Sequence, residues 1–550
     1  MQGASGTRAV ACGAAIAIPF LFPFVSGPSA SAWQLLGTLV CIAVLALVTA
    51  WIPGPRVQYR VLAWLAVPLI AIIAMRSDAV LAWLPASASL CAVALAVVVG
   101  SRASAHPAMF RAFSYGLLIA ALISAVLGLL QYYGHAEPLV PWTTSPGLGQ
   151  AYGNLRQRNQ FATLLSMATV ALLWLYATTG VSRRRRLLLL AALPLLLVGQ
   201  AAATSRTGLL QLLCIVGVAA WMARRDTRLP PWWLLCLCVP FYFVAGWVLP
   251  QLAGGGVDEM VVRLREGAPI GHSRLVLWRN VLALIAQHPW VGWGWGELSF
   301  AHYSTLYDGP RFVEILDNAH NLPLHLAVEL GIPVAVLVCG GFAWLVWSAR
   351  PWQERDPARL MVWGVLAMIV LHSLLEYPLW YGPFQLVFGV CLGLLWPAPA
   401  RAETSKRNRP LASALSAIAA LILIAVVGYA GWDYTRVSQI YLARDARLPA
   451  WRDDTLEKIR PSWLFANQVR FAKLALTPVT RANAEAVHAI AQRTLHFSPE
   501  PAVVIKLIES ATLLGRDDEA FAQAKRFRLA YPADYARWIA GQPMLGPGEQ

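Results

Sequence analysis

The stretch "RRRRLLLLAALPLLLVGQAAATSRTGLLQLLCIVGVAAWMARR" (residues 183–225) places two apolar segments between two groups of arginines. The segments 187–203 and 207–223 are each close to the ~20 residues that an α-helix needs to cross a bilayer. The short turn Thr204 to Thr207 separates them. Because basic residues favour the cytoplasmic side, the pattern predicts a hairpin of two transmembrane helices with its turn on the outer side of the membrane.

The rest of the chain has a similar composition. Of its 550 residues 58% are hydrophobic and only 13% are charged, which is too apolar for a soluble protein of this size. We therefore expect an all-α polytopic membrane protein with about 12–13 transmembrane helices. The candidate spans are 10–26, 33–52, 60–76, 79–100, 112–133, 159–180, 187–203, 207–223, 231–250, 322–348, 360–376, 379–396 and 412–431.

The formal net charge of +16 would suggest nucleic acid as a partner of a soluble domain. Here the arginines follow every even-numbered span, so they fit the positive-inside rule with a cytoplasmic N-terminus, and we expect membrane lipids and no nucleic acid as partners. The first apolar segment shows no clear cleavage site and is interpreted as a retained helix. The outer side then receives the loops 134–158 and 251–321 and everything after the last span.

We expect three regions along the chain. Residues 1–133 form N-terminal transmembrane helices, 134–435 form a core with the long loop 251–321 outside, and 436–550 form a C-terminal helical domain. The helical periodicity of "NAEAVHAIAQRTL" and "DDEAFAQAKRFRLAYP" in this tail indicates short amphipathic helices. Part of the tail resembles a tetratricopeptide helix pair.

Several common catalytic motifs are missing from the sequence. It contains no Walker-type phosphate loop, no H-E-x-x-H helix and no Asp-x-Asp pair, and "GWGWGE" (292–297) does not follow the strand that a dinucleotide fingerprint requires. These absences disfavour ATP-driven chemistry and metal-dependent use of nucleotide sugars. The sequence predicts no cofactor and no metal.

Arginines gather on the outer side, against the positive-inside trend. A single arginine there is compatible with an interface residue whose charge reaches water. Several arginines together predict an anionic ligand. Guanidinium forks grip two phosphate oxygens at once, and the anion expected at this surface is a lipid-linked diphosphate, which is also a good leaving group. The arginines are Arg156, Arg158, Arg206, Arg263, Arg265 and Arg274.

His320 stands between Asn318 and Asn321 in "ILDNAHNLPLHLAVELGIP" (315–333), where a polar loop enters an apolar helix. Its imidazole can accept a proton from a hydroxyl near neutral pH, which makes it the candidate base. The alternative is a histidine that caps the helix or only hydrogen-bonds the junction. We expect His325, one turn further on, to pack inside the bundle.

Glu376 and Tyr377, in "HSLLEYPLWYGPF" (372–384), end a span on the same outer side. They are either part of the polar site or an aromatic belt with a capped helix end. Otherwise the surroundings of His320 are expected to be poor in acids.

Six motifs together resemble the O-antigen ligase and polymerase superfamily: "AYGNLRQRNQFATLL" (151–165), "SRTG" (205–208), "HSRLVLWRN" (272–280), "HPWVGWGWGE" (288–297), "AHNLPLHLAVELGIP" (319–333) and "LLEYPLWY" (374–381). The first resembles the signature of the bacterial protein O-oligosaccharyltransferases of the PglL type, although Arg158 stands where a common variant has proline. The resemblance implies a multi-pass protein of the bacterial inner membrane with a periplasmic active site.

The resemblance also implies a reaction and roles for residues. A glycan would move from undecaprenyl diphosphate to Ser or Thr of a pilin-like acceptor protein in one inverting, metal-independent displacement. Arg206, Arg265, Arg274 and, more weakly, Arg263 would hold the diphosphate, and His320 would be the catalytic residue. Asn159, Gln160, Glu376 and Tyr377 would support the acceptor side.

Two alternatives remain open from the sequence. One is an O-antigen ligase that transfers glycan to lipid A-core. The other is a transporter or flippase of lipid-linked glycans, but transporters place their polar residues near the bilayer midplane, whereas here they gather at one face beside the long loop.

Overall fold

The computed structural model describes residues 2–29, 31–77, 79–178, 182–254, 271, 273–399 and 409–542. Nine helical segments within these ranges are long and apolar enough to cross a membrane. They are α2 (Ala32–Thr49), α4 (Trp83–Ala103), α5 (Pro107–Tyr132), α6 (Arg158–Thr178), α7 (Arg183–Ala202), α8 (Arg206–Ala223), α9 (Trp232–Cys236) with α10 (Cys238–Leu252), α14 (Leu322–Ala349) and α17 (Arg409–Ser438).

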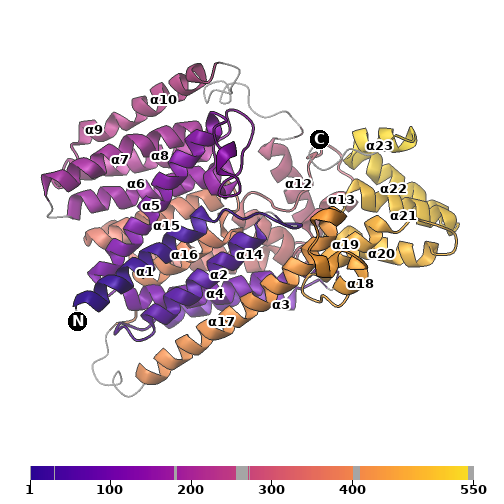
Figure 1. Cartoon of the computed structure of the whole chain (residues 1–550), viewed down its shortest axis with the longest axis horizontal. Helices are drawn as coiled ribbons and strands as arrows, with labels where there is room; N and C mark the ends of the chain where they lie inside the picture. The colour runs from indigo at the N-terminus through magenta and orange to yellow at the C-terminus, as the bar shows by residue number, and fades with distance from the viewer. Residues whose placement is uncertain are drawn as a thin grey trace.

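Four further apolar helices coincide with the remaining predicted spans. They are α1 (Gln2–Leu21), α3 (Tyr59–Ala74), α15 (Pro357–Ser373) and α16 (Gly382–Leu395). The prediction of an all-α polytopic membrane protein is therefore confirmed. In Figure 1 these helices form one bundle, with α17 along its edge and the C-terminal helices beyond one end.

The short helix α16 lies in the middle of the bundle, and all of its residues are buried. It packs closely against α4 because glycines line the contact. A Cβ atom on Gly393 would lie 2.1 Å from the Val97 carbonyl oxygen, and one on Gly100 would lie 2.2 Å from that of Val390. Small residues of this kind let transmembrane helices approach to backbone distance.

The helix α14 is broken near its first third, which the prediction of one continuous span 322–348 did not include. Gly331 has φ 82° and ψ 159°, and the segment 289–294 inserts at the break. Backbone hydrogen bonds run from Trp293 N to Val328 O (2.9 Å), and from Ile332 N to Pro289 O (2.8 Å). These bonds satisfy groups that the break would leave unpaired, as the interior of a membrane protein requires.

The described part of the predicted outer loop 251–321 includes the helices α12 (Arg274–Gln287) and α13 (Leu298–Ser304). Both pack with α14 around a second apolar core that includes Leu277, Leu284, Leu298 and Val328. These two helices therefore form a packed lobe that is held on the bundle through α14.

The tail continues from α17 into α18 (Thr455–Ile459), α19 (Ala466–Leu476), α20 (Ala484–Phe497), α21 (Pro501–Leu513), α22 (Asp517–Ala530) and α23 (Pro532–Ile539). Its core, with Val487, Leu507 and Phe527, includes Tyr303 of α13. The helical tail therefore packs on the lobe formed by α12 and α13.

Candidate functional site

Glu376, just after α15, is the centre of a polar network where several elements meet. Its Oε1 accepts a hydrogen bond from Asn159 Nδ2 at 2.9 Å and contacts Arg274 Nη2, and its Oε2 lies 2.6 Å from His320 Nδ1. The side chain is only 6% exposed. Burial alone would raise the pKa of Glu376, but the hydrogen bond from His320 and the charges of His320 and Arg274 outweigh it and lower the pKa. Glu376 is therefore a buried carboxylate.

This contact places Glu376 in the polar site itself, which is the first of the two alternatives that the sequence left open for it. A carboxylate only accepts hydrogen bonds, so His320 Nδ1 carries the hydrogen, and in the neutral ring Nε2 keeps a free lone pair. The His320 side chain is 26% exposed, so it remains accessible. The ring of Tyr377 stands edge-on to the imidazole, with centroids 4.9 Å apart. The carboxylate and the phenol together fix the orientation of the ring.

The junction before α14 holds His320 in an unusual backbone conformation. Its φ is 49°, in the left-handed region, which costs a non-glycine residue on the order of 1–3 kcal/mol. Its N–H donates to Asn318 Oδ1 at 3.0 Å. The helix cap is Asn321, whose side chain accepts from Leu324 N, and Pro323 stands in the first turn, where a missing backbone donor is tolerated. The imidazole is therefore not the cap.

Of the four arginines that were predicted to hold the diphosphate, the structure describes two. Arg274 begins α12 and joins the network through Glu376, while 37% of its side chain stays exposed. Arg206 is exposed at the start of α8, directly after Ser205, which contacts Asn159. Arg263 and Arg265 lie outside the described residues.

The residues of the "GNLRQRNQFA" motif also lie at this site. Asn159, in the first turn of α6, accepts from Ser205 Oγ at 2.6 Å while its Nδ2 binds Glu376. Gln160 is buried beside it. Arg158 donates to Thr204 Oγ1 at 3.2 Å, so it connects α6 to the turn before α8.

Sequence reasoning missed two residues of this network. Ser205 caps α8 by accepting from Gly208 N at 3.0 Å. Its position is therefore fixed, and its Oγ donates to Asn159 Oδ1. His372 is completely buried one helical turn before Glu376, and its Nδ1 lies 2.9 Å from Thr163 Oγ1. The spacing of His372 and Glu376, four residues apart on α15 and its end, is the signal that could have indicated it.

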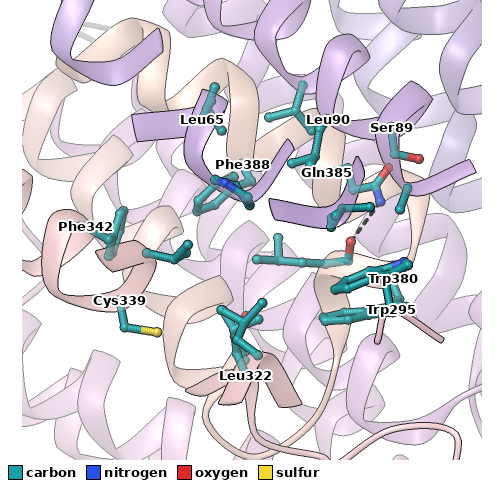
Figure 2. A pocket seen from close by; sticks show the side chains of 18 of the residues that line it. Leu65, Ser89, Leu90, Trp295, Leu322, Cys339, Phe342, Trp380, Gln385 and Phe388 are labelled. Carbon is teal, nitrogen blue, oxygen red and sulfur yellow. Dashed lines mark hydrogen bonds between the residues drawn. The ribbon is translucent and has the colours of Figure 1, made fainter. Parts of the chain in front are cut away.

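An apolar cavity of about 550 Å³ begins beside the network. Its lining includes Leu322 and Pro323, which follow His320 closely, and Leu374, which precedes Glu376. Figure 2 shows the stacked rings of Trp295 and Trp380 at one end of this cavity and Phe342 and Phe388 toward the other. The site thus combines a charged network with an adjoining apolar compartment.

Comparisons with known proteins agree with this arrangement. Three family profiles match the chain: "Protein glycosylation ligase" at residues 151–176, "O-Antigen ligase" at 191–339, and "Virulence factor membrane-bound polymerase, C-terminal" at 360–544. Asn159 lies in the first matched segment, Ser205, Arg274 and His320 lie in the second, and Glu376 lies in the third. Over these segments the chain is similar to O-antigen ligases and protein glycosylation ligases.

Two curated relatives come from Acinetobacter baylyi. The chain is 28% identical to a general O-oligosaccharyltransferase over 365 residues, which are 62% of this chain and 61% of the relative. It is 22% identical to a ComP-specific O-oligosaccharyltransferase over 258 residues, which are 45% of this chain and 44% of the relative. The chain therefore spans less than two thirds of the length of either relative.

Proposed function

We propose that the protein is a periplasmic O-oligosaccharyltransferase of the bacterial inner membrane. It would move a glycan from undecaprenyl diphosphate to the hydroxyl of Ser or Thr in an acceptor protein. The observation that carries the proposal is the contact of Glu376 with both His320 and Arg274. One buried carboxylate thereby places a candidate base next to a candidate diphosphate ligand.

The proposed reaction is a single displacement with inversion. The acceptor oxygen forms a bond to the anomeric carbon, its proton passes to His320 Nε2, and the bond from that carbon to the phosphate oxygen breaks. The electron pair leaves with undecaprenyl diphosphate. Arg274 and Arg206, together with Arg263 and Arg265 from the sequence prediction, stabilise the charge that develops on the diphosphate, so the donor itself supplies the free energy.

Each remaining residue of the network has a positioning role in this proposal. Glu376 keeps the hydrogen of His320 on Nδ1 and stabilises the imidazolium that forms, as a carboxylate does for a catalytic histidine. Asn159 fixes Glu376 and is fixed by Ser205. Gln160 and Tyr377 border the approach of the acceptor.

The apolar cavity supports a lipid-linked donor over a water-soluble one. Its lining is almost entirely hydrophobic and lies among transmembrane helices, beginning at Leu322 and Leu374 next to the polar network. A polyprenyl chain in this cavity would leave its diphosphate at the network. We therefore assign the cavity to the first isoprene units of the donor lipid.

The relatives support a protein as the acceptor, since both are O-oligosaccharyltransferases and one is ComP-specific. The decisive experiment incubates the purified protein with a lipid-linked glycan and either a pilin-like protein or lipid A-core. We expect glycan on the pilin-like protein. Transfer to lipid A-core alone would make the protein an O-antigen ligase, and donor movement across vesicles without transfer would make it a flippase.

The orientation of the site can be tested separately. Basic residues between Arg401 and Arg409 predict a cytoplasmic segment, and the tail after α17 then lies in the periplasm. A reporter that is active only in the periplasm should be active when it is fused after Pro449 and silent when it is fused within 401–409. The opposite pattern would place the site in the cytoplasm and refute the proposed reaction.

A further inference from the structure

A basic groove of about 440 Å³ lies in the C-terminal domain, away from the polar network. Arg460, Arg470, Lys473 and Arg493 line it, and its apolar residues include Val469 and Ile490. No Asp or Glu is among the described residues that line it. Four cations around one hollow repel each other, so the groove is suited to an anion.

Two acids that contact lining residues of the groove are already paired. Glu457 lies 3.4 Å from Arg460, in a pair whose two side chains are more than two thirds exposed and which therefore contributes little. Asp433, which is buried in α17, binds Arg436 and accepts from Ser462 Oγ at 2.8 Å. Burial, and then the charge of Arg493, lowers the pKa of Arg470, so positive charge is unfavourable here while no anion is bound.

The groove lies at the level of a membrane surface. One face of α17 exposes a row of apolar residues, which runs Leu411, Leu415, Ile418, Ile422, Val426, Tyr429 and Trp432. From Leu411 to Tyr429 this row is about 27 Å long at a rise of ~1.5 Å per residue, close to the ~30 Å hydrocarbon core of a bilayer. Tyr429 and Trp432 thus stand where aromatic residues mark the membrane–water interface.

Two contacts connect the groove to that level. Trp463 is 56% exposed and stacks on Tyr429, with ring centroids 5.9 Å apart. Val469 packs with Val437 in the last turn of α17. Figure 1 shows α18 and α19 beside this end of α17. Because Trp463 is only three residues from Arg460, the basic groove lies close to the aromatic residues that mark the membrane–water interface, which is the level of lipid phosphates.

We propose that this groove binds the phosphate of an anionic phospholipid, such as phosphatidylglycerol, in the leaflet on the side of the C-terminal domain. Lys473 and Arg493 contact the phosphate, and Val469, Ile490 and Trp463 contact the upper part of an acyl chain. An acidic protein segment would satisfy the same charges, but it would not use apolar residues at the height of the membrane interface. The bound lipid fastens the C-terminal domain to the membrane surface.

The test uses the full-length protein in nanodiscs that contain phosphatidylglycerol with a photo-reactive diazirine in its head group. We expect crosslinks in peptides from residues 460–493. The double variant Lys473→Gln/Arg493→Gln should reduce them by about thirtyfold, since each basic residue near an anionic surface contributes about fivefold to binding. The control Lys525→Gln/Arg528→Gln removes the same charge from exposed positions of α22 and should leave the crosslinks unchanged.

Thermal unfolding of each variant shows whether it is folded, and only folded variants enter the comparison. Equal crosslinking by a zwitterionic phosphatidylcholine probe, or an unchanged yield in the groove variant, would overturn the proposal. A Glu-rich peptide probe that crosslinks to 460–493 where the lipid probe does not would also overturn it, because the groove would then bind a protein partner.

Discussion

Two histidines five residues apart, His320 and His325, each lie against a glutamate, but in different surroundings. His320 contacts Glu376 from another part of the chain at 2.6 Å and is 26% exposed. His325 lies 3.4 Å from Glu329 on its own helix, and both side chains are 2% exposed. Trp295 and Trp380 pack edge-on against His325, whereas about a quarter of the His320 side chain stays exposed.

The difference separates a pair that can react from a pair that holds the fold. Glu329 also accepts from Gly296 N at 3.0 Å, so its carboxylate fastens the chain directly after the segment 289–294 that inserts at the break in α14. Glu376 instead joins a histidine to an arginine at the surface of the bundle. The same two residue types therefore have different roles because one pair is sealed by aromatic rings and the other meets the solvent.

The largest expected effect on transfer comes from His320→Ala. Removal of the base should reduce the transfer rate by a factor on the order of 10²–10⁴, while the donor still binds. Turnover is measured with purified protein and saturating lipid-linked glycan, with donor binding as the parallel measurement. Transfer at the parent rate would leave His320 as a junction residue and the arginines as the only catalytic groups.

Glu376→Gln should have the next largest effect. The amide keeps the shape of the side chain but no longer stabilises an imidazolium, so we expect a loss of about 100-fold, at the lower end of what general acid–base catalysis contributes. Added to His320→Ala it should cost little more, because residues that act as a unit are not additive. Glu329→Gln is the matched control and should keep the parent turnover per folded molecule. If the double variant lost transfer rate by the product of the two single losses, Glu376 and His320 would act independently and the proposed coupling would be wrong.

Arg274→Lys should weaken donor use more moderately. Lysine keeps the positive charge but loses the planar fork, so we expect about a tenfold higher KM for the donor with normal insertion into the membrane. Arg279→Lys, at an exposed position of the same helix, is the control. An unchanged KM at limiting donor would make Arg274 an interface residue that only supports Glu376.

The sequence predicts the fold better than the network. Each apolar segment carries its own signal of length and hydrophobicity, so all the predicted spans correspond to helices. The break at Gly331 depends on the insertion of the distant segment 289–294, and no local pattern marks it. The sequence could predict that His320, Arg274, Asn159 and Glu376 lie on one side of the membrane. It could not predict that the Glu376 carboxylate contacts the other three side chains.

The smallest expected effect on transfer, and a large one on stability, comes from His325→Ala. Glu329 would lose its buried partner and the two tryptophans would face a cavity, so the free energy of unfolding should fall by about 3 kcal/mol. Turnover per folded molecule should equal that of the parent, because His325 has no accessible edge. Thermal unfolding in detergent and turnover normalised to folded protein measure the two quantities. A variant with parental stability and strongly reduced turnover would reverse the comparison, because the buried pair would then take part in the reaction and the accessible one would not be sufficient for it.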